Sequence, residues 1–261
     1  MRSLYAIYRK EMGHYFVSPV AYVVVGVFLA LSAFFFNYFL GAVMQQALQM
    51  QMQGLEFGSH PNIDVTTEVM RAFFGLLSTL VLFLTPMLTM GVFSEERKRG
   101  TMELLMTSPI TEPQIVLGKF LASLTLFAIM LLPTAGYLIF IFARSEPAPP
   151  WRMLAAGYLG ILLLGGALLA LGSFISSLTE NQLIAAVLTF AAFLIVWVID
   201  LGRSAGGGAG DVLQYLSVIR HYDDFTRGVI DTSSLIYYLS FIFLFVFLTV
   251  RAIDSMRWRR A

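Results

Sequence analysis

The pattern of hydrophobic positions along this chain predicts six membrane-spanning helices. A spanning α-helix needs about 20 mainly apolar residues. Six segments approach or exceed that length without a single Asp, Glu, Lys, Arg or His, and they cover 17–40, 72–93, 120–143, 153–178, 183–199 and 235–250. The last two are short, so five or seven spans stay open as alternatives. We predict six.

The composition agrees with a membrane protein that crosses the bilayer several times. Hydrophobic residues make up 58% of the chain, charged residues make up 13%, and the mean hydropathy is +0.77. A soluble domain carries roughly 25% charged residues. We therefore predict one all-α transmembrane domain over 1–261. The chain has no cysteine, which excludes disulfides and thiolate metal sites.

The distribution of positive charge predicts the orientation in the membrane. With six spans and both termini in the cytoplasm, the inside segments hold 11 of the 17 Lys and Arg residues and the outside segments hold 6. Cytoplasmic loops carry such an excess of positive charge. Since topology accounts for these residues, the net charge of +1 gives no argument for nucleic-acid binding.

The segment before the first span, 3–16, is predicted to form a helix that lies at the membrane surface. At 3.6 residues per turn, apolar side chains share one face and Arg9 and Lys10 lie opposite. Glu11 projects from the apolar face, where an unpaired carboxylate is costly. Two interpretations stay open: Glu11 pairs with a cation on another segment, for which Arg97, Lys98 and Arg99 are the favoured partners, or the helix rotates and the carboxylate is solvated.

The inside loop 94–113 reads SEERKRGTMELLMTSPITEP and predicts a short helix parallel to the membrane. Thr101 is placed to cap that helix, and Glu103 in its first turn complements the positive helix end. Pro109 stops the helix, because the residue before a proline is biased away from helical geometry. Its apolar residues Leu104, Leu105 and Met106 are predicted to be available for docking. An ordinary positive loop accounts for the basic residues but not for this helix.

The fourth apolar segment is rich in small residues. Pairs spaced by four residues allow helices to approach closely in lipid, and such pairs occur at Gly166 and Ala170, Gly172 and Ser176, and Ser173 and Ser177. Packing within one chain is the favoured interpretation. A dimer face or a pore-lining face is the alternative.

The outside segment 200–233 is predicted to contain short helices that dip back towards the membrane, because its apolar residues recur with helical period. His221, Asp223 and Asp224 offer metal-ligand chemistry. Adjacent polar residues at the start of a helix more often act as caps or solvated charges. We therefore predict no metal site, no cofactor and no catalytic residue.

Four strings in this order carry a resemblance to a known family: KEMGHYFVSPVAY, EERKRGTMELLMTSP, SSLTENQ and HYDDFTRGVID. Together they resemble the type-2 ABC export permeases, in particular their gliding-motility-associated branch. The similarity extends over nearly the whole chain, and the second string, 95–109, is its most specific element.

The resemblance implies a permease of six spans that dimerises with a second copy or a homologous permease and sits on cytoplasmic ATPase subunits. It implies an inner-membrane location with lipid around the chain, and it leaves an accessory extracytoplasmic subunit open. The segment 101–106 would be the coupling helix, 3–16 the connecting helix and 211–231 a re-entrant lid. The residues assigned to ATPase coupling are Arg97, Gly100, Thr101, Glu103, Leu104, Leu105 and Met106, with Glu11 on the interfacial helix.

The chain is predicted not to hydrolyse ATP itself. A Walker A loop needs GxxxxGK followed by Ser or Thr. The only Gly-Lys pair, Gly118-Lys119, has Pro113 at the first glycine position and Phe120 after the lysine. Besides an ATP-driven export permease, two functions stay open: a non-transporting anchor or force-transmitting subunit, and an ion-coupled carrier. The carrier is disfavoured because such proteins place ionisable residues inside their spans.

Overall fold

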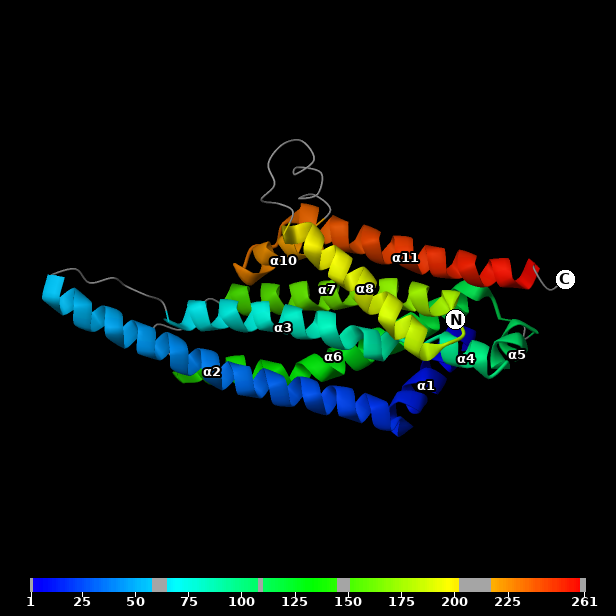
Figure 1. Cartoon of the computed structure of the whole chain (residues 1–261), viewed down its shortest axis with the longest axis horizontal. Helices are drawn as coiled ribbons and strands as arrows, with labels where there is room; N and C mark the ends of the chain where they lie inside the picture. The colour runs from blue at the N-terminus through cyan, green and yellow to red at the C-terminus, as the bar shows by residue number, and fades with distance from the viewer. Residues whose placement is uncertain (1, 58–64, 108–109, 145–150, 202–216, 259–261) are drawn as a thin grey trace.

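The computed structural model describes residues 2–57, 65–107, 110–144, 151–201 and 217–258, and within these ranges the chain is helical apart from short turns. The long helices run side by side, and two short ones, α4 and α5, lie at one end of the bundle (Figure 1). The helices are α1 (Arg2–Val17), α2 (Pro19–Phe57), α3 (Val65–Thr89), α4 (Ser94–Lys98), α5 (Thr101–Thr107), α6 (Glu112–Arg144), α7 (Trp151–Leu178), α8 (Gln182–Leu201), α10 (Val218–Thr226) and α11 (Thr232–Trp258).

Each of the six predicted apolar segments falls on a helix. Five of these helices, α2, α3, α6, α7 and α11, are long and apolar enough to cross a membrane. The apolar part of α8, Gln182–Val198, is shorter than that criterion requires. The chain is thus an all-helical, multi-pass membrane protein, and its sixth span stays a prediction.

Helix α2 is much longer than the predicted span, which ended at Leu40. It continues to Phe57 and has 39 residues, or about 58 Å at 1.5 Å per residue. The added stretch, 41–57, is rich in the good helix formers Met, Gln, Ala and Leu, and its two glycines, Gly41 and Gly54, do not stop the helix. In Figure 1 the end of α2 projects beyond the rest of the bundle.

Helix α7 is the central helix of the bundle, and it packs against α3, α6, α8, α10 and α11. Its small residues allow this contact. A Cβ added to Gly165 would lie 2.1 Å from the ring of Phe127 on α6, and one added to Gly172 would lie 2.3 Å from Oγ1 of Thr89 on α3. Ser176 and Ser177 are fully buried on the same helix. Packing within one chain is therefore confirmed for this segment.

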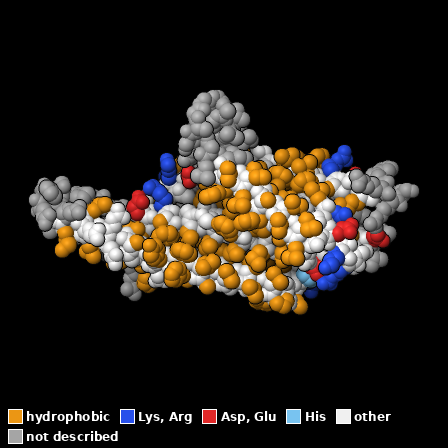
Figure 2. Space-filling view, viewed as in Figure 1, with side chains coloured by type: hydrophobic (Ala, Val, Ile, Leu, Met, Phe, Trp, Pro, Cys, Tyr) orange, Lys and Arg blue, Asp and Glu red, His pale blue; other side chains and the backbone are white. Residues whose placement is uncertain are grey.

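Charged and apolar side chains occupy different parts of the surface. Apolar side chains cover the middle of the bundle, and charged side chains gather towards its two ends (Figure 2). The predicted surface helix is present as α1, which packs along α6. Helices α1, α4 and α5 and the described end of α11 lie at the same end of the bundle, and α10 lies towards the other end (Figure 1).

Candidate functional site

The candidate site is the elbow that joins α3 to α6 through α4 and α5. The backbone N–H groups of Phe93 and Ser94 both donate to Oγ of Ser176 on α7, at 3.2 Å each. The same hydroxyl donates to the carbonyl oxygen of Met90 at 3.0 Å. One serine thus fixes the start of the elbow to the central helix.

The turn between α4 and α5 depends on a glycine. Gly100 has φ +69°, in the left-handed region, and its N–H donates to the carbonyl of Arg97 at 3.1 Å. Residues with a Cβ rarely adopt this conformation. The string KRGT therefore ends α4 and sets the direction in which α5 leaves.

Arg97 binds the bundle itself. Its Nη1 donates to the carbonyl oxygen of Ser177 at 2.7 Å, and its Nη2 forms an ion pair with Glu180 at 3.0 Å. Ser177 belongs to the last turn of α7, where carbonyl groups lack helical partners and a cation is favourable. Arg97 therefore joins α4 to the end of α7.

Helix α5 begins at Thr101, as the sequence predicted, and side chains of its first turn contact the rest of the elbow. Oγ1 of Thr101 donates to the carbonyl oxygen of Glu96 at 3.3 Å, so this hydroxyl links α5 to α4. Its role as the cap of α5 stays a prediction. Met102, which the sequence analysis did not single out, is 4% exposed in a cluster with Phe93 and Ile115.

The structure describes the exposure of only some of the α5 side chains that were predicted to contact the ATPase. Glu103 is exposed. Leu105 is half-buried against the Met102 cluster, so its predicted availability is only partial. The side chains of Leu104 and Met106 lie outside the described ones.

A buried ionic cluster connects α1, α4 and α6 beside this elbow. Nζ of Lys119 lies 3.0 Å from Oε1 of Glu11 and 3.1 Å from Oε1 of Glu96, and it donates to the carbonyl oxygen of Val92 at 2.9 Å. The side chain of Lys119 is 2% exposed. All three ammonium donors thus have acceptors, which is the condition for holding this charge inside a protein.

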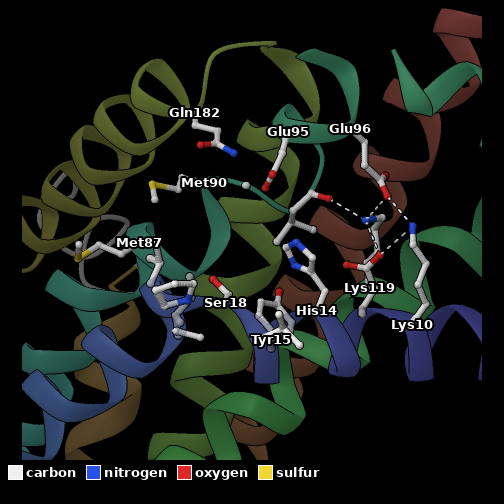
Figure 3. A pocket seen from close by; sticks show the side chains of 18 of the residues that line it. Lys10, His14, Tyr15, Ser18, Met87, Met90, Glu95, Glu96, Lys119 and Gln182 are labelled. Atoms are coloured by element: carbon white, nitrogen blue, oxygen red, sulfur yellow. Dashed lines mark hydrogen bonds and ion pairs between the residues drawn. The ribbon is translucent and has the colours of Figure 1, made fainter. Parts of the chain in front are cut away.

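Lys10 completes the cluster from its exposed side. Its Nζ lies 3.2 Å from Oε1 of Glu96 and 3.7 Å from Oε1 of Glu11. Burial lowers the pKa of Lys10, but the two carboxylates outweigh this effect and raise the pKa above its usual value. Figure 3 shows Lys10, Lys119 and Glu96 meeting at this point.

The predicted pairing of Glu11 across segments is confirmed, and its predicted partners are wrong. Glu11 is 9% exposed and pairs with Lys119 of α6, whereas Arg97 and Arg99 pair with Glu180 and Glu95. The partner differs because α1 packs along α6 and not along α4.

The predicted outside segment is described only in part, since 202–216 lie outside the described residues. The described part forms α10, whose residues Val218, Tyr222 and Phe225 are buried in the bundle. The ring of His221 stacks on Tyr237 at 4.0 Å, and its Nδ1 lies 2.9 Å from the carbonyl oxygen of Ser217. Over the part of the chain that the structure describes, no group of three or more potential ligand side chains could hold a metal ion.

Comparison with known proteins gives results that agree with each other. Residues 5–253 match the model of a family described as "ABC-2 family transporter protein". The chain is also similar to a protein described as "Probable multidrug ABC transporter permease YbhR" from Escherichia coli (strain K12) and from Escherichia coli O157:H7. In each case the identity is 26% over 174 residues, which cover 65% of this chain and 45% of the relative. The chain thus spans less than half of these relatives' length.

Proposed function

We propose that this chain, which belongs to the ABC-2 transporter family, forms the translocation pathway of an ATP-driven exporter and is driven by a separate ATPase subunit. Permeases of this family lack a nucleotide-binding domain and generally work with an ATPase partner. The chain is a multi-pass membrane protein of the same kind. Work must therefore enter it by contact with another subunit.

The observation that carries this proposal is the set of bonds around α4. Through Glu96, α4 is linked to Lys119 of α6, which also holds Glu11 of α1. Through Arg97, it is linked to the end of α7. A force applied to α5 would pass to α4 and, through these bonds, to α1, α6 and α7 together. We assign α5 as the coupling helix and α1 as the connecting helix on this basis.

The orientation follows from the same assignment. We propose that the end with α4 and α5 faces the cytoplasm together with both termini, and that α10 with the segment 200–233 lies on the other side as a re-entrant lid. The inner membrane is the proposed location. A dimer with a second copy or a homologous permease, an accessory extracytoplasmic subunit and the gliding-motility-associated branch remain expectations from the resemblance.

Single-cysteine labelling tests the orientation, because the native chain contains no cysteine. Positions 1, 105, 180 and 261 are expected to react only from the cytoplasmic side, and positions 55, 147 and 215 only from the opposite side. Labelling of position 215 from the cytoplasmic side would overturn the six-span arrangement.

The coupling assignment is tested with the double variant Leu104→Asp/Leu105→Asp. We expect normal membrane insertion but loss of the co-purifying ATPase and of ATP-driven transport, since burial of one leucine contributes roughly 1.5–3 kcal/mol. Leu178→Asp is the matched control, because Leu178 is an exposed leucine near Arg97 but outside α5.

The thermal stability of the isolated variant separates lost docking from local unfolding. Because Leu105 is half-buried, the single variant Leu104→Asp decides the matter if the double variant is destabilised. Normal co-purification and full transport in that variant would remove the coupling role from α5, whereas the absence of any transport by the wild type with its ATPase would favour a non-transporting anchor.

A further inference from the structure

A cavity of about 600 Å³ opens beside the ionic cluster, between α1, the start of α2, the end of α3 and the start of α8. One side of it is charged and the other is apolar. The charged side includes Lys10, His14, Glu95 and Arg99, and the apolar side includes Val20 and Met87. Figure 3 shows His14, Glu95 and Gln182 around the same space.

The cavity lies where the membrane meets water. No charged residue occurs between Arg71 of α3 and Glu95 of α4, so Glu95 marks the end of the stretch suited to hydrocarbon. On the neighbouring side, Val17 is 81% exposed and Val20 is 45% exposed. Exposed apolar side chains directly beside charged ones are typical of this boundary.

The charges of the cavity are arranged to receive an anion. Glu11 and Glu96 also line the cavity, but they are largely buried and already bound to Lys119. The most exposed charges are cations: the side chain of Lys10 is 60% exposed and that of Arg99 is 67% exposed, whereas the carboxylate of Glu95, which also lines the cavity, is 24% exposed and paired with Arg99.

These cations retain donors for a ligand. Within the described part of the chain, Arg99 forms an ion pair through Nη2 with Glu95 at 2.5 Å. A guanidinium has five N–H donors in a planar fork that matches phosphate. Nε2 of Gln182 adds an uncharged donor beside Gly91.

We propose that this cavity binds the phosphate-bearing headgroup of a membrane amphiphile, whose acyl or prenyl chain lies along α2 and α3. The phosphate meets Arg99, Lys10 and His14, and the chain lies over Val20 and Met87. Ligand pockets of this kind have volumes of about 300–1,000 Å³. The site needs only the membrane location of the protein, so it stands independently of ATP-driven export.

The test uses the detergent-purified full chain and native mass spectrometry. The probes are dioleoylphosphatidylglycerol, dioleoylglycerol with the same chains but no phosphate, and undecaprenyl phosphate. We expect retention of the two phosphate-bearing probes and at least tenfold weaker binding of dioleoylglycerol. Tighter binding of phosphatidylglycerol identifies a bulk membrane lipid, and tighter binding of undecaprenyl phosphate identifies a lipid-linked cargo.

Two variants locate the binding site. Glu95→Gln/Arg99→Gln keeps the net charge and removes both members of a pair, and its matched control is Glu68→Gln/Arg71→Gln, an exposed pair on the far end of α3. Gly91→Leu fills the cavity, since a Cβ there would lie 3.4 Å from Glu95 and 3.5 Å from Gln182, and its control is Gly136→Leu in open space.

Both cavity variants are expected to lose at least tenfold in affinity for the phosphate probes, and both controls are expected to bind normally. Equal binding by the wild type and the Glu95→Gln/Arg99→Gln variant, or equal binding of dioleoylglycerol, would overturn the proposal. If Gly91→Leu does not fold, the charge variant alone decides. Neither result depends on the ATPase, so failure here leaves the coupling assignment intact.

Discussion

The two ends of the bundle are held together by different forces. At the α4–α5 end, the ionic cluster around Lys119 joins α1, α4 and α6. At the other end, α10 is held by neutral groups: the hydroxyl of Tyr222 donates to the carbonyl of Phe74 at 3.0 Å, and the hydroxyl of Tyr238 donates to the carbonyl of Val218 at 2.6 Å. Stacking of His221 on Tyr237 adds to these contacts.

This difference indicates which end can move as a connected unit. The attraction between charges falls only with the inverse of distance, so the Lys119 cluster tolerates a small displacement of α4 and still pulls on α1 and α6. Neutral hydrogen bonds weaken steeply when their geometry changes, and ring contacts are equally short-ranged. The first end is therefore suited to receiving motion, and the second is suited to holding α10 in place.

Removal of the central cation is expected to have the largest effect on stability. Lys119→Met leaves Glu11 and Glu96 without their buried partner, and breaking a buried ion pair in this way costs about 3–5 kcal/mol. Thermal unfolding of the purified chain in detergent measures the loss. Lys98→Met is the control, because Lys98 is exposed at the same end.

A second substitution shows whether unpaired charge is the cause. The double variant Glu11→Gln/Lys119→Met removes one of the two carboxylates, and the other, Glu96, keeps its ion pair with Lys10. We therefore expect this variant to regain part of the stability that Lys119→Met loses. If Lys119→Met is no less stable than Lys98→Met, the cluster does not hold this end together.

An added methyl group at the other end is expected to have an intermediate effect. In Gly160→Ala, the new Cβ would lie 2.5 Å from Cβ of Phe225, an atom attached directly to the backbone of α10. Because a ring rotation cannot relieve this contact, α10 must shift, and overpacking of this kind costs about 1–3 kcal/mol.

The matched control for this substitution is Gly136→Ala, whose Cβ would have no neighbour within 4 Å. We expect that control to be neutral or slightly stabilising, since alanine favours a helix by up to about 1 kcal/mol over glycine. Equal thermal stability of the two variants would mean that α10 is not held rigidly against α7.

The sequence predicted the helices better than the bonds between them. Long apolar segments locate the spans, because hydrocarbon imposes their length and composition. The α4–α5 turn has a signal in the sequence, because Gly100 is the residue type that a left-handed backbone favours. The end of α2 was missed because its several Gln residues are too polar for a membrane span, although Gln and Met are both good helix formers.

The missed partner Lys119 shows why the candidate site could be predicted only in part. A lone lysine near the start of a span fits the positive-inside rule, so its position gave no reason to expect burial. One signal was present: Ile115, Lys119, Ala122 and Leu126 share one face of α6, and the other three are apolar. Glu11 showed the same pattern on α1, but only the packing of α1 along α6 brings the two charges together.

Loss of one neutral hydrogen bond is expected to have the smallest effect. Tyr222→Phe removes the hydroxyl that donates to the carbonyl of Phe74, and such a bond contributes about 0.5–1.5 kcal/mol. The carbonyl of Phe74 lies within α3, where it also accepts the helical N–H bond, so it is not left without a partner. We therefore expect a loss near the lower limit, measured by thermal unfolding against Tyr5→Phe, which changes an exposed tyrosine. A loss as large as that of Lys119→Met would mean that the α10 end, too, depends on a single dominant contact, and the contrast between the two ends would fail.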